Sequence, residues 1–153
     1  MKHQNQGFTL IELLVVLTLV AVVIGFSLTA IASYVAHQEI ERSVTTVTTT
    51  LTETRQRTLA AETDTQFAVS FATSSISWFV YPYGSGVVHD HELPGVSVTY
   101  NFSHNENQII FSRLRGEVNA TGTVTVSHPR IGRTINIHID RSGRYSLETD
   151  SAD

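Results

Sequence analysis

The chain has 153 residues, no cysteine and a formal net charge of −4. This length suits one domain of about 100 residues with an anchor segment, and the lack of cysteine excludes disulfides and thiolate metal sites. The acidic balance excludes a general polyanion binder but allows a local basic patch.

A long apolar segment follows a short polar leader. Residues 7–35 read GFTLIELLVVLTLVAVVIGFSLTAIASYV and, after Gly7, carry Glu12 as their one charge. About 20 apolar residues suffice to cross a bilayer, and Lys2 supplies a positive flank for the cytoplasmic side. A secretory signal peptide would have a shorter apolar core followed by a small-residue cleavage site. A plain membrane anchor explains the length but not a carboxylate inside the run, which should have a partner.

The motif GFTLIE at residues 7–12, with the apolar run after it, resembles the leader of type IV pilins and type II secretion pseudopilins. The resemblance implies that a prepilin peptidase removes the leader peptide, residues 1–7, by cutting between Gly7 and Phe8, and methylates the new amino terminus at Phe8. It also implies that Glu12 is an assembly determinant. The implied partners are this peptidase, an inner-membrane assembly platform and other pilin or pseudopilin subunits.

The position of Glu12 agrees with that role. It lies four residues after Phe8 and therefore on the same helix face, one turn away. In the membrane its carboxylate can pair with the Phe8 ammonium of its own chain or of a neighbour. The positive end of the helix dipole also favours an acid there. We therefore expect Glu12 to set the axial register of an incoming subunit.

The helix is expected to continue beyond the membrane. We predict a transmembrane and filament-core helix over residues 8–36 and an amphipathic continuation over residues 37–63. The continuation has an apolar stripe with spacings of 4, 3 and 4, made by Ile40, Val44, Val47 and Leu51. Gly25 either marks a site of local melting or permits close packing of helices.

From Gln66 onward the apolar residues alternate with a period of two, which predicts strands. The predicted strands are Gln66–Phe71, Ile76–Tyr81, Val96–Phe102, Gln108–Ser112, Gly122–His128, Thr134–Asp140 and Arg144–Glu148. Short turns without helices between them favour antiparallel pairing. The sequence thus predicts an α+β fold, with the long helix packed on an antiparallel β domain over residues 64–148 and a disordered tail over residues 149–153.

The glycine turns and strand order of this half resemble the pseudopilin H and minor-pilin FimT-type domain. The segments that carry the resemblance are LPGV at 93–96, IF at 110–111, RG at 115–116, TGTVTVS at 121–127, GRTINI at 132–137 and SGRY at 142–145. The resemblance implies two antiparallel sheets packed on the long N-terminal helix.

The histidines offer a possible metal site. His89 and His91 would share one face of a strand, and imidazole suits zinc or copper. The alternative is a polar loop, and nothing in the sequence supplies a third and fourth ligand. We therefore expect no metal or other cofactor. No catalytic signature surrounds any serine, and there is no phosphate-binding glycine loop, so we do not expect an enzyme.

Six of the ten basic residues fall within the last 41 positions: Arg113, Arg115, Arg130, Arg133, Arg141 and Arg144. They could form a stripe that binds phosphates, or they could be solvated residues at strand ends. FimT-type minor pilins are implicated in DNA uptake through a C-terminal Gly-Arg-x-Arg motif. Here Arg144 matches the first arginine and Ser146 replaces the second. Arg141 and Arg144 are the candidate DNA contacts.

Taken together, these features predict a structural subunit, a minor pilin or pseudopilin, of a type IV filament that serves type II protein secretion. The first alternative is a minor pilin of a type IV pilus that binds DNA for uptake in transformation. The second is a membrane-anchored periplasmic metal binder or enzyme. The expected location is the bacterial inner membrane, crossed once, with the β domain on the extracytoplasmic side and the subunit incorporated in a pilus or pseudopilus.

Overall fold

The computed structural model describes residues 9–60, 65–82, 89–104 and 106–150, with only the backbone of residues 26–30. The expected cleavage site between Gly7 and Phe8 therefore lies outside the described residues. The chain forms two compact units, residues 1–35 and residues 36–153, and helix α1 (Leu10–Ala60) contributes to both.

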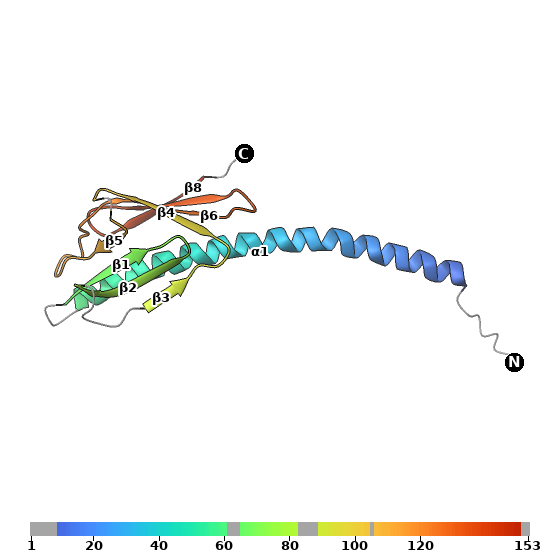
Figure 1. The fold of residues 1–153 in the computed structure, drawn as a ribbon, viewed down its shortest axis with the longest axis horizontal. Coiled ribbons are helices and arrows are strands. Elements are labelled where there is room, and N and C mark those ends of the chain that lie inside the picture. The colour runs from blue at the N-terminus through green and yellow to red at the C-terminus, as the bar shows by residue number, and fades with distance from the viewer. Residues whose placement is uncertain (1–8, 61–64, 83–88, 105, 151–153) are drawn as a thin grey trace. The chain divides into compact units, whose positions relative to one another are not determined.

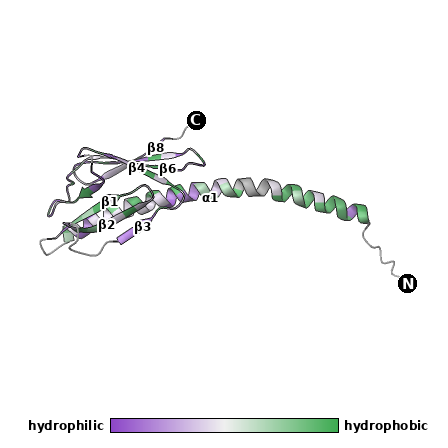
Figure 2. Ribbon diagram, in the orientation of Figure 1, coloured by the Kyte–Doolittle hydropathy of each residue, from purple (hydrophilic) through white to green (hydrophobic). Residues whose placement is uncertain are grey.

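In the first unit, α1 is apolar on all sides. Every side chain described from Leu10 to Gly25 is exposed in the single chain. Figure 2 shows this stretch of α1 as predominantly hydrophobic, whereas the later turns of α1 are mixed. Among the described residues, which omit residues 1–8 and the side chains of 26–30, no helix combines the length and the apolar character needed to cross a membrane.

In the second unit, α1 buries the stripe that its sequence predicts. Ile40 and Val47 are fully buried, and Val44 and Leu51 are at most 5% exposed. The spacing of 4, 3 and 4 places all four on one helix face, which packs into the core. The described part of the helix ends at Ala60, and the rest of the predicted continuation lies outside the described residues.

Threonine is frequent in this part of α1, and its hydroxyl groups bond to the helix itself. The buried Thr54 donates to the carbonyl of Thr50 at 2.7 Å, and the buried Thr58 donates to the carbonyl of Thr54 at 2.9 Å. Because a buried polar group is costly without a hydrogen bond, these contacts allow β-branched polar residues to face the core.

The strands form two four-stranded antiparallel sheets. The first sheet has the order β3-β2-β1-β5 and the second has the order β4-β6-β7-β8. Their bounds are β1 Gln66–Phe71, β2 Ser75–Tyr81, β3 His89–Glu92, β4 Ser97–Phe102, β5 Gln108–Ile110, β6 Gly122–Ser127, β7 Thr134–Ile139 and β8 Tyr145–Asp150. Figure 1 shows them as two layers with the second half of α1 alongside both. The predictions of antiparallel pairing and of two sheets on one helix are confirmed.

One hydrophobic core joins the helix and both sheets. Residues of α1, β1 and β2 lie in the same cluster as residues of β6 and β7. The alternation predicted for β7 is confirmed, since Ile135, Ile137 and Ile139 are at most 5% exposed while the residues between them are half-buried. The chain interleaves the sheets, because β4 belongs to the second sheet and β5 returns to the first.

Three elements differ from the sequence predictions. Residues 89–92 form the edge strand β3, which was not among the predicted strands. The strand predicted to reach Ser112 ends at Ile110, and Phe111 makes only an isolated bridge to Val118. Strand β8 continues to Asp150, so the first two residues of the predicted tail pair with β7, and residues 151–153 lie outside the described residues.

Candidate functional site

The first described turn of α1 is capped by Thr9. The Thr9 hydroxyl accepts a hydrogen bond from the backbone N–H of Glu12 at 3.3 Å, and the Thr9 carbonyl accepts one from Leu13 at 3.2 Å. Thr9 is therefore the N-cap, and the helix begins at Leu10 rather than at Phe8. The spacing Thr-x-x-Glu, which is typical of a capping box, was available in the sequence as a signal for this start.

Glu12 lies in this first turn, where the partial positive charge of the helix end favours a carboxylate. Its side chain is exposed, and the turns that follow expose apolar side chains on every side: Leu13 is 58% exposed and Ile24 is 54% exposed. A helix that is apolar all round is stable only when lipid or other protein covers it. The structure thus presents a single acid at the start of a rod that requires an apolar environment.

The six clustered arginines divide between opposite ends of the second unit. Arg133 lies near the start of this unit's part of α1, where it pairs with Glu41 at 2.8 Å. The turn that carries Arg113 and Arg115 lies at the other end, beside the turn that carries Arg141, because Val118 N–H donates to the Arg141 carbonyl at 3.1 Å.

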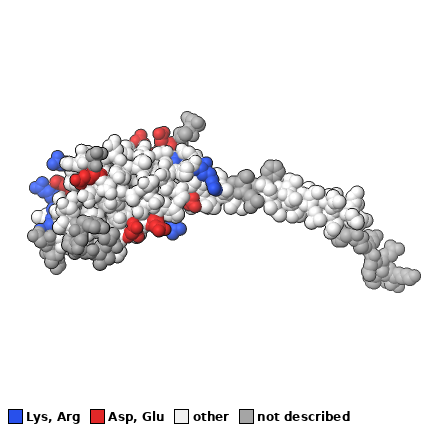
Figure 3. All heavy atoms as spheres, viewed as in Figure 1, with Lys and Arg blue, Asp and Glu red and all other residues white. Residues whose placement is uncertain are grey.

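The contact between these two turns is close. A Cβ atom on Gly143 would collide with the carbonyl oxygen of Gly116, so the backbones of the turns meet directly. Figure 3 shows basic side chains gathered at this end, on the left in the view. Both candidate DNA contacts, Arg141 and Arg144, therefore lie in a turn that adjoins Arg113 and Arg115, a neighbourhood that sequence spacing did not reveal.

The turn between β7 and β8 is held by Asp140. Its carboxylate accepts hydrogen bonds from the Ser142 hydroxyl at 2.6 Å and from the Arg144 backbone N–H at 3.1 Å. The Ser142 hydrogen bond, together with the Arg144 backbone bond and the Arg144 charge, lowers the pKa of Asp140 below its ordinary 3.8. The side chain at residue 144 is consequently presented from an ordered turn.

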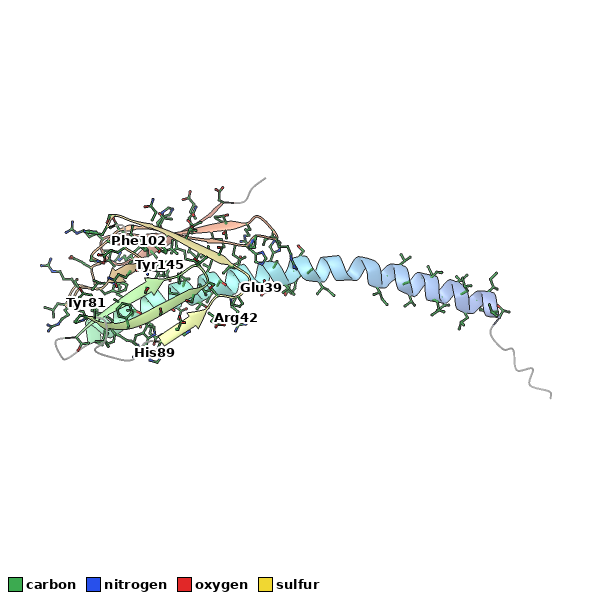
Figure 4. All side chains as sticks on the ribbon, viewed as in Figure 1. Glu39, Arg42, Tyr81, His89, Phe102 and Tyr145 are labelled. Carbon is green, nitrogen blue, oxygen red and sulfur yellow. The ribbon has the colours of Figure 1, made fainter. Side chains whose placement is uncertain are left out.

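The histidines predicted as possible ligands make other contacts. His89 stacks on Trp78 with ring centroids 4.2 Å apart, and the Arg57 guanidinium lies 4.5 Å from the Trp78 ring centroid. Figure 4 shows His89 on β3. His91 lines a groove with threonines of α1. Among the described residues, no group of three or more histidine, cysteine or acidic side chains is arranged to hold a metal ion.

His128, which is buried, and His138, which is half-buried, pair with glutamates. His128 is 5% exposed, its Nε2 lies 3.0 Å from Glu39, and its Nδ1 accepts from the Arg130 backbone N–H at 3.2 Å. His138 Nε2 lies 2.8 Å from Glu148. These pairs join α1 to the β6–β7 turn and β7 to β8, and so they have structural roles.

Comparison with known proteins bears on the N-terminal segment. Residues 2–28 match the prokaryotic N-terminal methylation motif. The chain therefore carries a type IV pilin-like prepilin signal, and the match includes Gly7, Phe8 and Glu12. No curated protein and no solved structure is significantly similar to the chain. The methylation motif implies processing by a prepilin peptidase and assembly with other pilin subunits.

Proposed function

We propose that this protein is a minor structural subunit of a type IV filament, a pseudopilin that serves type II protein secretion. The observation that carries the proposal is the methylation motif at residues 2–28, placed directly on a capped helix whose exposed surface is apolar. The lack of cysteine favours a minor pilin or pseudopilin, because many major pilins close a C-terminal loop with a disulfide.

In this proposal the apolar segment enters the inner membrane with Lys2 on the cytoplasmic side, and the β domain lies outside the cytoplasm. The prepilin peptidase then cuts after Gly7 and methylates the new amino group of Phe8. The subunit leaves the lipid when its apolar helix packs among the helices of other subunits, so that protein replaces lipid around the same exposed side chains. The subunit itself has no catalytic role.

Glu12 guides that packing. In the apolar interior a carboxylate is stable when it pairs with a cation, and the nearest cation of the mature chain is the Phe8 ammonium one turn away. Pairing with the ammonium of a neighbouring subunit would give each incoming helix one favoured axial position.

The test is mass spectrometry of the membrane-extracted protein from cells with an active prepilin peptidase. The expected product begins at a methylated Phe8, and a peptidase-deficient strain provides the control. An intact start at Met1 in the active strain would overturn the proposal.

The arginine end of the β domain favours a second candidate, a minor pilin that binds DNA for uptake. The observation is the contact between the turn of Arg113 and Arg115 and the turn of Arg141 and Arg144. Several arginines on adjoining turns can contact successive phosphates, and such binding weakens steeply with salt.

A gel-shift experiment with the detergent-solubilised chain tests this candidate. The expected shift of duplex DNA at low salt is lost in Arg141→Ala/Arg144→Ala, whereas Arg130→Ala/Arg133→Ala, at the other end of the domain, retains it. The absence of a shift at low salt, or an equal loss in both variants, excludes DNA binding at this end.

A further inference from the structure

Leu114 lies at the tip of a tight turn, and most of its side chain is exposed to solvent. It is 89% exposed, the highest value among the large apolar side chains described. Among the described residues other than glycine, it alone has a positive φ, 68°. This backbone conformation costs an L-residue about 1–2 kcal/mol, whereas glycine would adopt it freely. An exposed leucine therefore occupies a position where glycine would serve the fold better.

The turn is rigid despite its exposure. Within it, Arg115 N–H donates to the Arg113 carbonyl at 2.8 Å, and Gly116 N–H donates to the Ser112 carbonyl at 2.9 Å. Ser112 N–H donates to the Glu117 carbonyl at 2.7 Å and closes the base. Arg55 of α1 donates to the Gly116 carbonyl at 3.2 Å and ties the turn to the helix. We call residues 112–117 the Leu114 knob.

The knob combines an apolar tip with positive charge. Arg113 and Arg115 flank the leucine, and Arg115 is 79% exposed and lies 3.8 Å from Glu117. A surface that accepts this knob should offer exposed apolar groups for the leucine and carboxylates for the arginines. Because the knob is already ordered, docking it costs little conformational entropy.

The second unit itself presents a hollow whose lining combines carboxylates and hydroxyls with exposed prolines. A pocket of about 650 Å³ is lined by two carboxylates, three serines, a glycine and four apolar residues, two of which are prolines. We call it the Asp90 pocket, and its lining residues are Ser74, Ser75, Asp90, Glu92, Leu93, Pro94, Gly95, Val96, Ser97 and Pro129. Asp90 and Glu92 lie on the edge strand β3 with exposed side chains.

The knob and the pocket lie at opposite ends of the unit. Ser112 and Glu117 of the knob line a cleft with Tyr81, whereas Gly95 of the pocket packs against Glu39. Figure 4 shows Tyr81 and Glu39 at the two ends of the β domain. Along α1, Arg55 at the knob and Glu39 at the pocket are separated by roughly 24 Å of helix at 1.5 Å per residue. One molecule therefore cannot fill its own pocket.

We propose that the Leu114 knob of one copy docks in the Asp90 pocket of the next copy. The leucine contacts the prolines, and the flanking arginines meet the carboxylates at the rim. Two different surfaces at opposite ends make a heterologous contact, which generates an open chain of subunits rather than a closed dimer. The inference rests on the proposed filament function and applies wherever two copies of this subunit are neighbours, whose β domains it joins outside the helical core.

Disulfide trapping in membranes of producing cells tests the contact with the full chain. The chain has no cysteine, so any disulfide must form between introduced residues. We expect Leu114→Cys/Ser74→Cys to give dimers and higher multimers after mild oxidation, because each copy then carries both halves of the contact. The matched control is Leu114→Cys/Thr99→Cys, which uses an exposed position on β4 outside the pocket and should give no such series.

Charge reversal provides a second measurement in the trapping background. Arg115→Glu alone, or Asp90→Lys alone, should lower the multimer yield about fivefold, which corresponds to roughly 1 kcal/mol for an exposed pair. The two changes in one chain should restore most of the yield, since the reversed charges again attract across the contact. A failure of the combined variant to exceed either single variant contradicts the pairing of these groups.

The outcomes separate this inference from the proposed function. A correct start at Phe8 without the multimer series overturns the knob contact and leaves the filament function standing. A start at Met1 counts against the filament function by itself. Disulfides to a different protein, in place of the multimer series, overturn the assignment of a second copy as the occupant.

Discussion

At Asp140, one exposed carboxylate organises the turn between β7 and β8. It accepts from the Ser142 hydroxyl and from the Arg144 backbone N–H, and both bonds favour the ionised form. The pKa of Asp140 is consequently lower in the folded chain than in the unfolded chain. A group of this type stabilises the fold above its unfolded pKa, and this stabilisation is lost as the pH falls through its folded pKa.

We expect Asp140→Asn to lower the free energy of unfolding at neutral pH, because the amide oxygen is a weaker acceptor than the carboxylate. The difference from the parent should shrink as the pH falls below 3.8, the ordinary value, and should be lost once the pH has passed through the lower pKa of folded Asp140. Urea unfolding of the detergent-solubilised chain, followed by fluorescence of the single tryptophan, measures the effect. A difference that persists unchanged at the lowest pH would show that the charge is not responsible.

Leu114 has a backbone conformation that is unfavourable for a residue with a side chain, because its φ is positive. Replacing it with glycine removes the cost of a positive φ but adds freedom to the unfolded chain. We expect Leu114→Gly to raise the free energy of unfolding by about 0.5 kcal/mol. Gly132→Ala is the reverse test, because Gly132 also has a positive φ, 63°, and an added Cβ would meet open space. We expect it to lower the free energy of unfolding by about 1 kcal/mol.

Both changes are read by the same urea titration. A loss of stability in Leu114→Gly would contradict the inference that glycine serves the fold better at this position, and it would remove the reason to seek an external partner for the leucine.

At the scale of elements, β7 and β8 show how burial differs between paired strands. Ile137 and Leu147 are register partners, so they lie side by side on one sheet face. Ile137 is fully buried, whereas Leu147 is 54% exposed. The hydrophobic core thus ends at β7. The edge strand β8 completes the hydrogen bonding of β7, but its own side chains are exposed to solvent.

This difference predicts unequal costs for the same truncation. Ile137→Ala should lower the free energy of unfolding by about 2–5 kcal/mol, as expected for a buried aliphatic side chain. Leu147→Ala should lower it by about 1 kcal/mol or less, because half of its surface already contacts solvent. Equal losses in the two variants would mean that β8 is covered in the folded protein.

At the scale of the whole molecule, the two units differ in where their apolar side chains lie. The β domain satisfies its apolar surface internally through one core, whereas the first unit exposes apolar side chains along its described length. The first unit therefore presents an apolar surface to its surroundings, and its methylation motif indicates assembly with other pilin-like subunits. In the proposed function, Glu12 acts only within that assembly.

We expect Glu12→Ala to leave processing largely intact and to reduce incorporation into filaments at least tenfold. The reason is that a buried ammonium left without its carboxylate is destabilised by several kcal/mol. The helix start should survive, because Thr9 bonds to the backbone N–H of residue 12 and not to its side chain. Immunoblots of sheared filaments and of membranes measure the ratio of incorporated to membrane-bound subunit.

The matched control for that variant is Thr18→Ala, which removes another exposed polar side chain of the same helix, bonded to the Val15 carbonyl. Its incorporation should match that of the parent. Normal incorporation of Glu12→Ala would count against a pairing role for the acid.

The sequence by itself determined the features that depend on local pattern. Apolar spacing identified the buried face of α1 and most of the strands, because burial on one face imposes a period of 3.6 or 2 on neighbouring residues. The leader motif identified the processing signal for a similar reason, since a peptidase reads a short contiguous segment. The N-cap at Thr9 was also present as a Thr-x-x-Glu spacing, although the helix was expected to begin at Phe8, two residues before its observed start at Leu10.

Only the tertiary structure decided the features that join distant residues. The polar segment 89–92 becomes β3 because β2 offers a free edge, and its own pattern contains no apolar alternation to indicate this. The assignment of β4 and β5 to different sheets depends on which partner completes the core. That packing also brings the Leu114 knob close to the Arg141 turn and keeps the knob away from the Asp90 pocket. Neither result could be predicted from the sequence, because distance along the chain does not fix distance in space.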